Sequence, residues 1–361
     1  MKKLFFSMLA VAAMASCSKS DLIERPVAPA AGDVEILASS NAKGITTRTP
    51  FVGAIASDNK LLAQVFVSLK SNDYTTLWNT ADDQMEFDST DSIGFKNTPC
   101  YYPADGSTVY LCGFYPSTGW TTTSNRQVYT IDGKSDVMTA KEVSGNKKDA
   151  QDENKFAPKL TFDHLLTQLV VKVEATDSAA YKAWGKITDM YLTNAAGHVS
   201  GGVGIRQEVR VVPGTGATTY GAADDGALAT LPYYGIDKTD GMTDIEFGKD
   251  NAGAAKAVEL PVLKDGEEPV AVAYTLVTPV PVTATPVTEK HYTMVIKTEN
   301  HTDAKTVDVT LKTKDTPATN FSTATTGYAF DVVLTFNATE IMATATVTDW
   351  KEGGVTDITI Q

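Results

Sequence analysis

Residues that carry metal or catalytic chemistry are scarce in this chain of 361 residues. It holds three cysteines and four histidines, with no CxxC pair and no H-E-x-x-H motif, so the sequence offers no zinc site. It also lacks the G-x-G-x-x-G motif of dinucleotide binding and the G-x-S-x-G motif of hydrolases. The sequence therefore predicts that the protein is not an enzyme and binds no metal or cofactor.

Positive charge is scarce as well. The chain has 31 Lys+Arg against 44 Asp+Glu, which gives a formal net charge of −13. Nucleic acids and anionic membrane surfaces attract basic surfaces, so we expect neither as a partner. Only five positions are arginine, and these are Arg25, Arg48, Arg126, Arg206 and Arg210.

One long apolar stretch is present, and it lies at the N-terminus. Lys2 and Lys3 precede a mostly apolar run from Leu4 to Ala15. A helix needs about 20 residues to cross a bilayer, so this shorter run predicts a secretory signal peptide over residues 1–16. Cys17 follows small residues in a pattern that resembles a bacterial lipobox. We therefore expect a lipid on Cys17 that tethers the protein outside the cytoplasm.

The other two cysteines, Cys100 and Cys112, flank the stretch YYPADGSTVYL. This stretch predicts a hairpin that turns at Asp105-Gly106. A three-residue turn would place the cysteines opposite one another, and an exported protein can form a disulfide. The sequence favours two buried free thiols, with a disulfide between Cys100 and Cys112 as the alternative.

Short runs of alternating apolar and polar residues dominate the rest of the chain and predict an all-β protein built from antiparallel sandwiches. One short helix is expected at 177–185, a domain boundary within 176–186, and a long surface excursion over 213–256. The expected strands are 33–39, 62–69, 109–115, 165–175, 203–212, 271–277, 292–297, 306–313, 328–336, 341–347 and 354–361.

The first expected strand precedes an arginine in a loop. Val34, Ile36 and Ala38 share one face of that strand, and Arg48 follows in a Gly/Thr-rich stretch of the kind that proteases cut. A cut after Arg48 would release residues 17–48 and expose an apolar groove with an unpaired strand edge. The alternative is a flexible lipid tether with an incidental arginine.

Five stretches, taken together in their order, resemble the fimbrillin family, the lipoprotein-derived (type V) pilins of Bacteroides-type bacteria. They are the lipobox at Cys17, ITTR at 45–48, YYPADGSTVYLCGFYP at 101–116, LTFDHLLTQLVVKV at 160–173, and TTGYAFDVVLTFNATEIMATATVTDWKEGG at 325–354.

The resemblance implies two transthyretin-like antiparallel β-sandwich domains in tandem. The implied organisation is a signal peptide at 1–16, a lipidated propeptide at 17–48, an N-terminal sandwich at 49–178 and a C-terminal sandwich at 179–361. It implies a structural pilin subunit that supports cell adhesion and colonisation. The precursor would sit on the outer membrane through its lipid, and the mature protein would be part of an extracellular fimbrium.

The resemblance also implies how the subunit assembles. A trypsin-like, Arg-specific protease would cut between Arg48 and Thr49, and the vacated groove would take a C-terminal strand from another copy or a related pilin. Such a contact repeats into a filament. The donor side chains would be Ile341, Ala343, Ala345 and Val347, or Ile358 and Ile360.

A different reading of the same chain stays open. It is a monomeric outer-membrane surface lipoprotein, or a pilus-tip adhesin, that binds a glycan or a host protein. Its aromatic loops would be YYGIDKTDGM at 233–242 and the region around Trp120.

Overall fold

The protein is all-β, as the sequence predicts. The computed structural model describes residues 33–42, 60–80, 83–87, 93–152, 157–193, 206–221, 230–237, 241–279, 292–309 and 326–348. Strands up to β20 and two short helices, α1 (Lys147–Ala150) and α2 (Ser178–Trp184), occupy these ranges. Neither described helix has the length and apolar character needed to cross a membrane.

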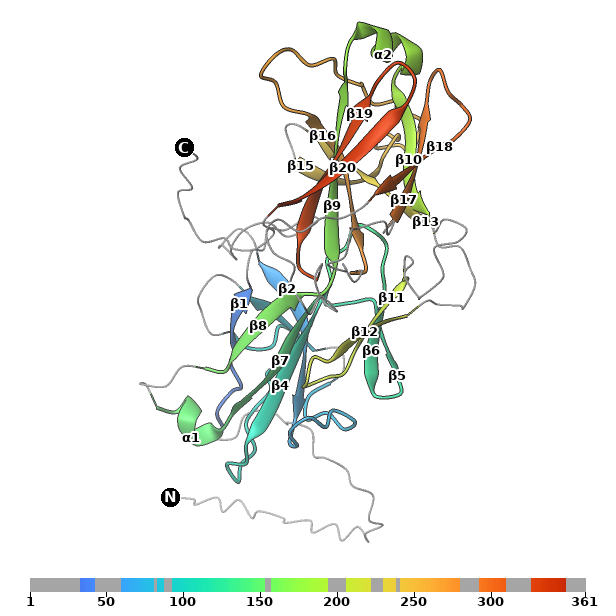
Figure 1. Cartoon of the computed structure of the whole chain (residues 1–361). Coiled ribbons are helices and arrows are strands. Elements are labelled where there is room, and N and C mark those ends of the chain that lie inside the picture. The colour runs from blue at the N-terminus through green and yellow to red at the C-terminus, as the bar shows by residue number, and fades with distance from the viewer. Residues whose placement is uncertain are drawn as a thin grey trace, which may run out of the picture.

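The strands form four sheets in two lobes (Figure 1). The first lobe holds two sheets. In order, the first is β1 (Ser39–Ala42), β8 (Lys159–His164), β7 (Met138–Gly145), β4 (Val109–Tyr115), β2 (Leu61–Ser68) and β3 (Gln84–Phe87). The second is β12 (Thr218–Gly221), β11 (Glu208–Val211), β6 (Arg126–Thr130) and β5 (Trp120–Thr123).

The second lobe holds the other two sheets and α2. One is β13 (Thr230–Pro232), β10 (Ile187–Thr193), β17 (Tyr292–Thr298) and β18 (Lys305–Val309). The other is β15 (Gly241–Glu246), β14 (Tyr234–Asp237), β16 (Val270–Val277), β9 (Thr167–Ala175), β19 (Ala329–Phe336) and β20 (Ile341–Thr348).

Two apolar cores lie on opposite faces of the first sheet. On β2, Val65 and Val67 point into a core that belongs to the first lobe alone, whereas Phe66 points to the other face. The core that contains Phe66 continues under β6 and β11 and into the second lobe. Successive residues of β2 therefore point into different cores, because both faces of this sheet are covered.

Most strands with clear alternation are where the sequence predicts them. The runs 62–69, 109–115, 271–277, 292–297, 328–336 and 341–347 correspond to β2, β4, β16, β17, β19 and β20. The short helix is confirmed as α2. The Asp177 side chain accepts a hydrogen bond from the Ala180 amide at its N-terminus, and Gly185 ends it at φ 73°.

The hairpin expected between Cys100 and Cys112 is wrong. A turn does form at Asp105-Gly106, where the Gly106 amide donates to the Pro103 carbonyl. The arm before the turn does not pair with β4, because β2 and β7 already occupy both edges of β4. Tyr101 pairs with Glu35 instead.

The surface excursion expected over 213–256 is also wrong. Strands β12 to β15 lie within it, and Tyr233 and Phe247 are buried there. Its strands are short and contain many Gly and Thr residues, so no alternating pattern revealed them. A few apolar anchors, not periodicity, hold this part of the chain on the sheets.

Two sheets combine strands from both sides of the boundary expected at 178/179. Strand β9 lies between β16 and β19 in the second lobe, although it precedes that boundary. Strand β11 follows the boundary but pairs with β6 in the first lobe.

Residues 131–137 lie between β6 and β7 of the first lobe and contact the second lobe. We call them the inter-lobe loop. The Gly133 carbonyl accepts a hydrogen bond from the Leu276 amide at 2.7 Å. The Tyr234 hydroxyl donates to the Asp132 carbonyl at 2.9 Å. At the end of the loop, Asp136 is buried and lies 2.6 Å from His164 Nδ1. A loop of the first lobe is therefore fixed to two strands of the second.

Candidate functional site

The N-terminal described segment, residues 33–42, closes the first sheet into a ring, and we call it the closing segment. At one edge of the sheet, Met85 of β3 pairs with Phe95. The chain from Phe95 leads to Ile93, which pairs with Ala38. A few residues later, β1 pairs in parallel with β8 at the opposite edge of the sheet (Figure 1). We call the space that the closing segment fills, between residues 93–102 and β8, the seam.

Backbone hydrogen bonds attach the closing segment to residues 93–102, which form one wall of the seam, and to Pro158, the residue before β8. Five of them lie outside the regular ladder with β8, at distances of 2.7–3.0 Å. They run from Ile36 N to Cys100 O, Ala38 N to Ile93 O, Ile93 N to Ala38 O, Tyr102 N to Val34 O and Ser39 N to Pro158 O. The segment is therefore hydrogen-bonded along most of its length.

The side chains of the closing segment alternate between core and solvent. Ile36 and Ala38 are 0% exposed in the core of the first lobe, and Val34 packs against that core. Leu37, between them, is 36% exposed. The sequence predicted these inward positions, but it predicted one strand over 33–39. The regular strand begins at Ser39, because Glu35 and Ala38 pair with Tyr101 and Ile93 only as isolated bridges.

Sequence reasoning did not find the walls of the seam. Ile93, Cys100 and Tyr102 lie between short turns without a strand pattern, and the other wall, β8, comes much later in the chain. No local signal connects these segments to residue 36. Only the pairing of distant edges brings them together.

Cys100 and Cys112 are both free and buried, and they lie in different cores. Cys100 shares the first-lobe core with Ile36, and Cys112 lies on the opposite face of the sheet. Burial raises the pKa of each thiol to about 12, because the thiolate loses its hydration. Neither thiol is therefore appreciably ionised near neutral pH.

The closing segment should control the reactivity of one thiol. In protein produced from Ser18 onward, we expect a thiol reagent at pH 8 to label neither Cys100 nor Cys112, because only the thiolate reacts. A variant that lacks residues 33–42 should expose Cys100, bring its pKa back toward the usual value and label there, while Cys112 stays protected. Mass spectrometry of the labelled peptides measures both sites, with urea-unfolded protein as the positive control. Equal labelling of the two sites in the variant would contradict the seated position of the segment.

The C-terminal part of the described chain also ends in an edge strand. Strand β20 pairs with β19 over all eight of its residues and is the last strand of its sheet. Of the side chains expected to act in assembly, Ala345 is buried, and Ile341 and Ala343 pack partly against the large core. The backbone of Val347 is paired with Phe330.

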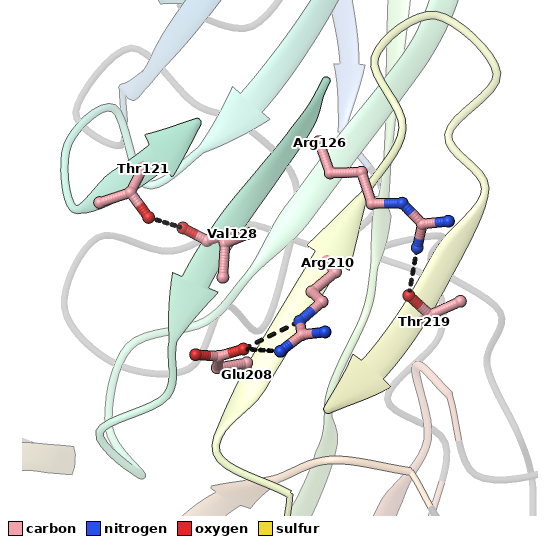
Figure 2. Close-up of polar contacts among 6 residues, drawn as sticks. All are labelled: Thr121, Arg126, Val128, Glu208, Arg210 and Thr219. Atoms are coloured by element: carbon pink, nitrogen blue, oxygen red, sulfur yellow. Dashed lines mark hydrogen bonds and ion pairs between the residues drawn. The ribbon is translucent and has the colours of Figure 1, made fainter. Parts of the chain in front are cut away.

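Three of the five arginines are engaged in structure. Figure 2 shows Arg126 and Arg210 on adjacent strands β6 and β11, with the Arg126 guanidinium donating to the Thr219 hydroxyl at 2.9 Å. Arg210 donates to the Glu208 carboxylate through Nε and Nη2, at 2.9 and 2.6 Å. The Arg206 amide donates to the Thr278 hydroxyl. A protease needs an extended, accessible chain, so these three sites are poor substrates.

Several predicted residues lie outside the described part of the chain. These are Cys17, Arg48, Thr49, Ile358 and Ile360. Their roles therefore stay predictions.

Comparison with known proteins identifies the family. A model of the fimbrillin-like family matches residues 47–350, which is most of the chain. The chain belongs to the fimbrillin-like family. Members of this family assemble with other fimbrial subunits, so this fimbrillin-like chain is a structural protein of surface fimbriae and not an enzyme.

A solved structure shares the fold of this chain. A candidate cell adhesion protein from Bacteroides uniformis, 16% identical, superimposes with a TM-score of 0.52 over 90% of this chain and 100% of its own. A fimbrial protein from Bacteroides vulgatus is 14% identical, with a TM-score of 0.42 over 80% of this chain and 92% of its own. The fimbrial anchor protein Mfa2 from Porphyromonas gingivalis is 10% identical, with a TM-score of 0.35 over 87% and 98%. The last two likenesses are too weak to support a conclusion. No curated protein matches the fimbrillin-like chain.

Proposed function

We propose that the closing segment is a temporary strand, removed by proteolysis so that another subunit can insert a strand in its place. In this proposal the chain is exported with its signal peptide, lipidated on Cys17 and held on the outer membrane. An Arg-specific protease then cuts after Arg48. Residues 17–48 leave with the lipid, and subunits join into the fimbrium by exchanging strands.

The observation that carries the proposal is the burial of a segment that lies upstream of Arg48. Full burial of the Ile36 side chain contributes roughly 1.5–3 kcal/mol, and each backbone hydrogen bond about 1 kcal/mol. With five bonds outside the ladder and further bonds to β8, the loss approaches the stability of about 5–15 kcal/mol of an ordinary domain. An open seam would therefore bind another strand strongly.

The positions of the arginines favour Arg48 as the cleavage site. Three of the alternatives are hydrogen-bonded within or next to paired strands. The fourth, Arg25, precedes Pro26, a bond that trypsin-like proteases cut poorly. A cut after Arg48 also separates the whole closing segment from the rest of the chain.

Of the two candidate donors, we propose residues 354–361, with Ile358 and Ile360 as the inserted side chains. Donation of β20 would break its pairing with β19 over eight residues. It would also uncover the edge of the core that extends from Phe66 into the second lobe. The side chains Ile341, Ala343, Ala345 and Val347 would then stay with their own subunit. The donor and the seam are different parts of the chain, so such a contact would repeat into a filament.

A deletion separates the donor from the fold. The chain without residues 354–361 should be cut after Arg48 like the full chain but remain monomeric, while its unfolding transition stays unchanged. Electrophoresis in mild SDS measures the oligomer ladder, N-terminal sequencing identifies the cut, and circular dichroism checks the fold. If the deleted chain still forms the ladder, residues 354–361 are not the donor. If the full chain stays monomeric after a complete cut, the proposed assembly is wrong.

A further inference from the structure

One wall of the seam contains a glycine whose role the assembly scheme does not explain. Gly94 lies between Ile93, which pairs with Ala38 of the closing segment, and Phe95, which pairs with Met85 of β3. It is thus part of the narrow link that joins the sheet to the closing segment. The Ile93 amide and carbonyl both bond to Ala38, at 2.9 Å each, so the backbone on this wall is held close to the segment.

Backbone conformation does not require a glycine at position 94. Its φ lies outside the left-handed region, in contrast to ten other glycines of the described chain. What distinguishes this glycine is that side chains of the closing segment lie directly over it, so a larger residue would have to displace them. A Cβ at this position would overlap the Glu35 carboxylate oxygen, and it would lie 3.1 Å from Glu35 Cδ and 3.4 Å from Leu37 Cδ2.

All three of these nearest atoms belong to the closing segment. Gly113 and Gly145, two other glycines of the first sheet with ordinary φ, differ in this respect because their surroundings are permanent parts of the fold. A Cβ on Gly113 would meet Phe162 of β8, and one on Gly145 would meet Tyr102 and Pro158. The space over Gly94 is therefore filled by the strand that lies in the seam, and it empties when that strand leaves.

We propose that Gly94 is a specificity-determining residue of the seam, and this inference rests on the strand exchange proposed above. The outward side chains of a seated strand lean over Gly94, as Glu35 and Leu37 do. A side chain at position 94 would take up space on the solvent side of the seated strand. On the core side the strand has no room to move, because Ala38 is already fully buried. Gly94 thus keeps the seam open to strands with long outward side chains.

The closing segment is covalently attached to the precursor and a neighbour's strand is not, so a side chain at position 94 should affect the two strands differently. The closing segment of the uncut precursor is part of the same chain, so its effective concentration is high and it stays seated despite a poorer fit. A strand from another subunit has no such advantage. Gly94→Val should therefore leave the precursor folded and impair only the acceptance of a neighbour's strand.

Mixed assembly tests this directly. After cleavage, Gly94→Val chains alone should form about tenfold fewer dimers and longer oligomers than wild-type chains, because every contact needs one chain that accepts a strand. Mixed with wild type at a low ratio, they should shorten the ladder, because each inserts its own donor strand but accepts a neighbour's strand poorly. Gly235→Val is the matched control, since this glycine also has ordinary φ and its Cβ would come no closer than 3.4 Å, to Thr243 Oγ1.

A second measurement does not depend on assembly. The cleaved closing segment should leave the Gly94→Val protein about tenfold faster than wild type, as followed by chromatography of the released peptide. Adding Glu35→Ala and Leu37→Ala to the Gly94→Val chain should restore slow release. Wild-type ladder length together with wild-type release would overturn the role of Gly94. A wild-type chain that stays monomeric after cleavage would overturn the strand exchange instead, and the release rates would still decide whether Gly94 contacts the seated strand.

Discussion

An Arg48→Ala chain is expected to remain uncut at this position and monomeric in the presence of an Arg-specific protease. A protease pocket built for a guanidinium rejects a side chain without one by roughly 10⁴-fold. Without the cut, residues 33–42 keep their place in the seam, and no neighbouring strand can enter. Mass spectrometry of the treated protein and electrophoresis in mild SDS measure the two effects.

Arg126→Ala serves as the matched control. This substitution also removes one arginine, but from a paired strand where its guanidinium bonds to Thr219. The variant should be cut after Arg48 and assemble like the wild type. If Arg126→Ala blocks assembly and Arg48→Ala does not, the cleavage site has been assigned to the wrong arginine.

Gly133→Ala is expected to destabilise the protein by about 3 kcal/mol, because two unfavourable effects combine. Gly133 has φ 84°, which an alanine adopts only with strain. A Cβ there would lie 2.8 Å from Thr275 Oγ1 and 3.1 Å from the Pro232 carbonyl, in the contact between the lobes. The midpoint of thermal unfolding should fall by roughly 5–10 °C.

Gly253→Ala isolates the cause of that loss. Gly253 has nearly the same φ, 77°, but a Cβ there would meet nothing within 4 Å. It should cost only the conformational strain, about 1 kcal/mol. Equal losses for the two variants would show that the contact between the inter-lobe loop and the second lobe accommodates a Cβ without cost.

Local patterns in the sequence were sufficient for much of the fold. Strands β2, β4, β16 and β19 appear where predicted, since short apolar runs bounded by turn residues indicate strands whatever their partners are. The helix α2 follows from its Asp177 cap and its terminal glycine. In the closing segment, alternation predicted that Ile36 and Ala38 share one face, and both are buried while Leu37 between them is exposed.

Pairing partners could not be predicted in this way. The sequence placed Tyr101 in a hairpin with β4, but β2 and β7 fill both edges of that strand, and Tyr101 pairs with Glu35. The stretch 213–256 looked like a surface excursion because its strands are too short to show a period. Which edge a segment joins depends on competition among edges that are distant in the sequence.

The sequence by itself determined the class of the fold, the faces of its longer strands and the scarcity of arginine and of metal ligands. Only the tertiary structure decided that residues 33–42 close a ring, that three arginines are held in or beside strands, and that the closing segment fills the space over Gly94. The physical reason is that side-chain periodicity is a property of neighbouring residues. A seam exists only where two remote sheet edges leave room for one more strand.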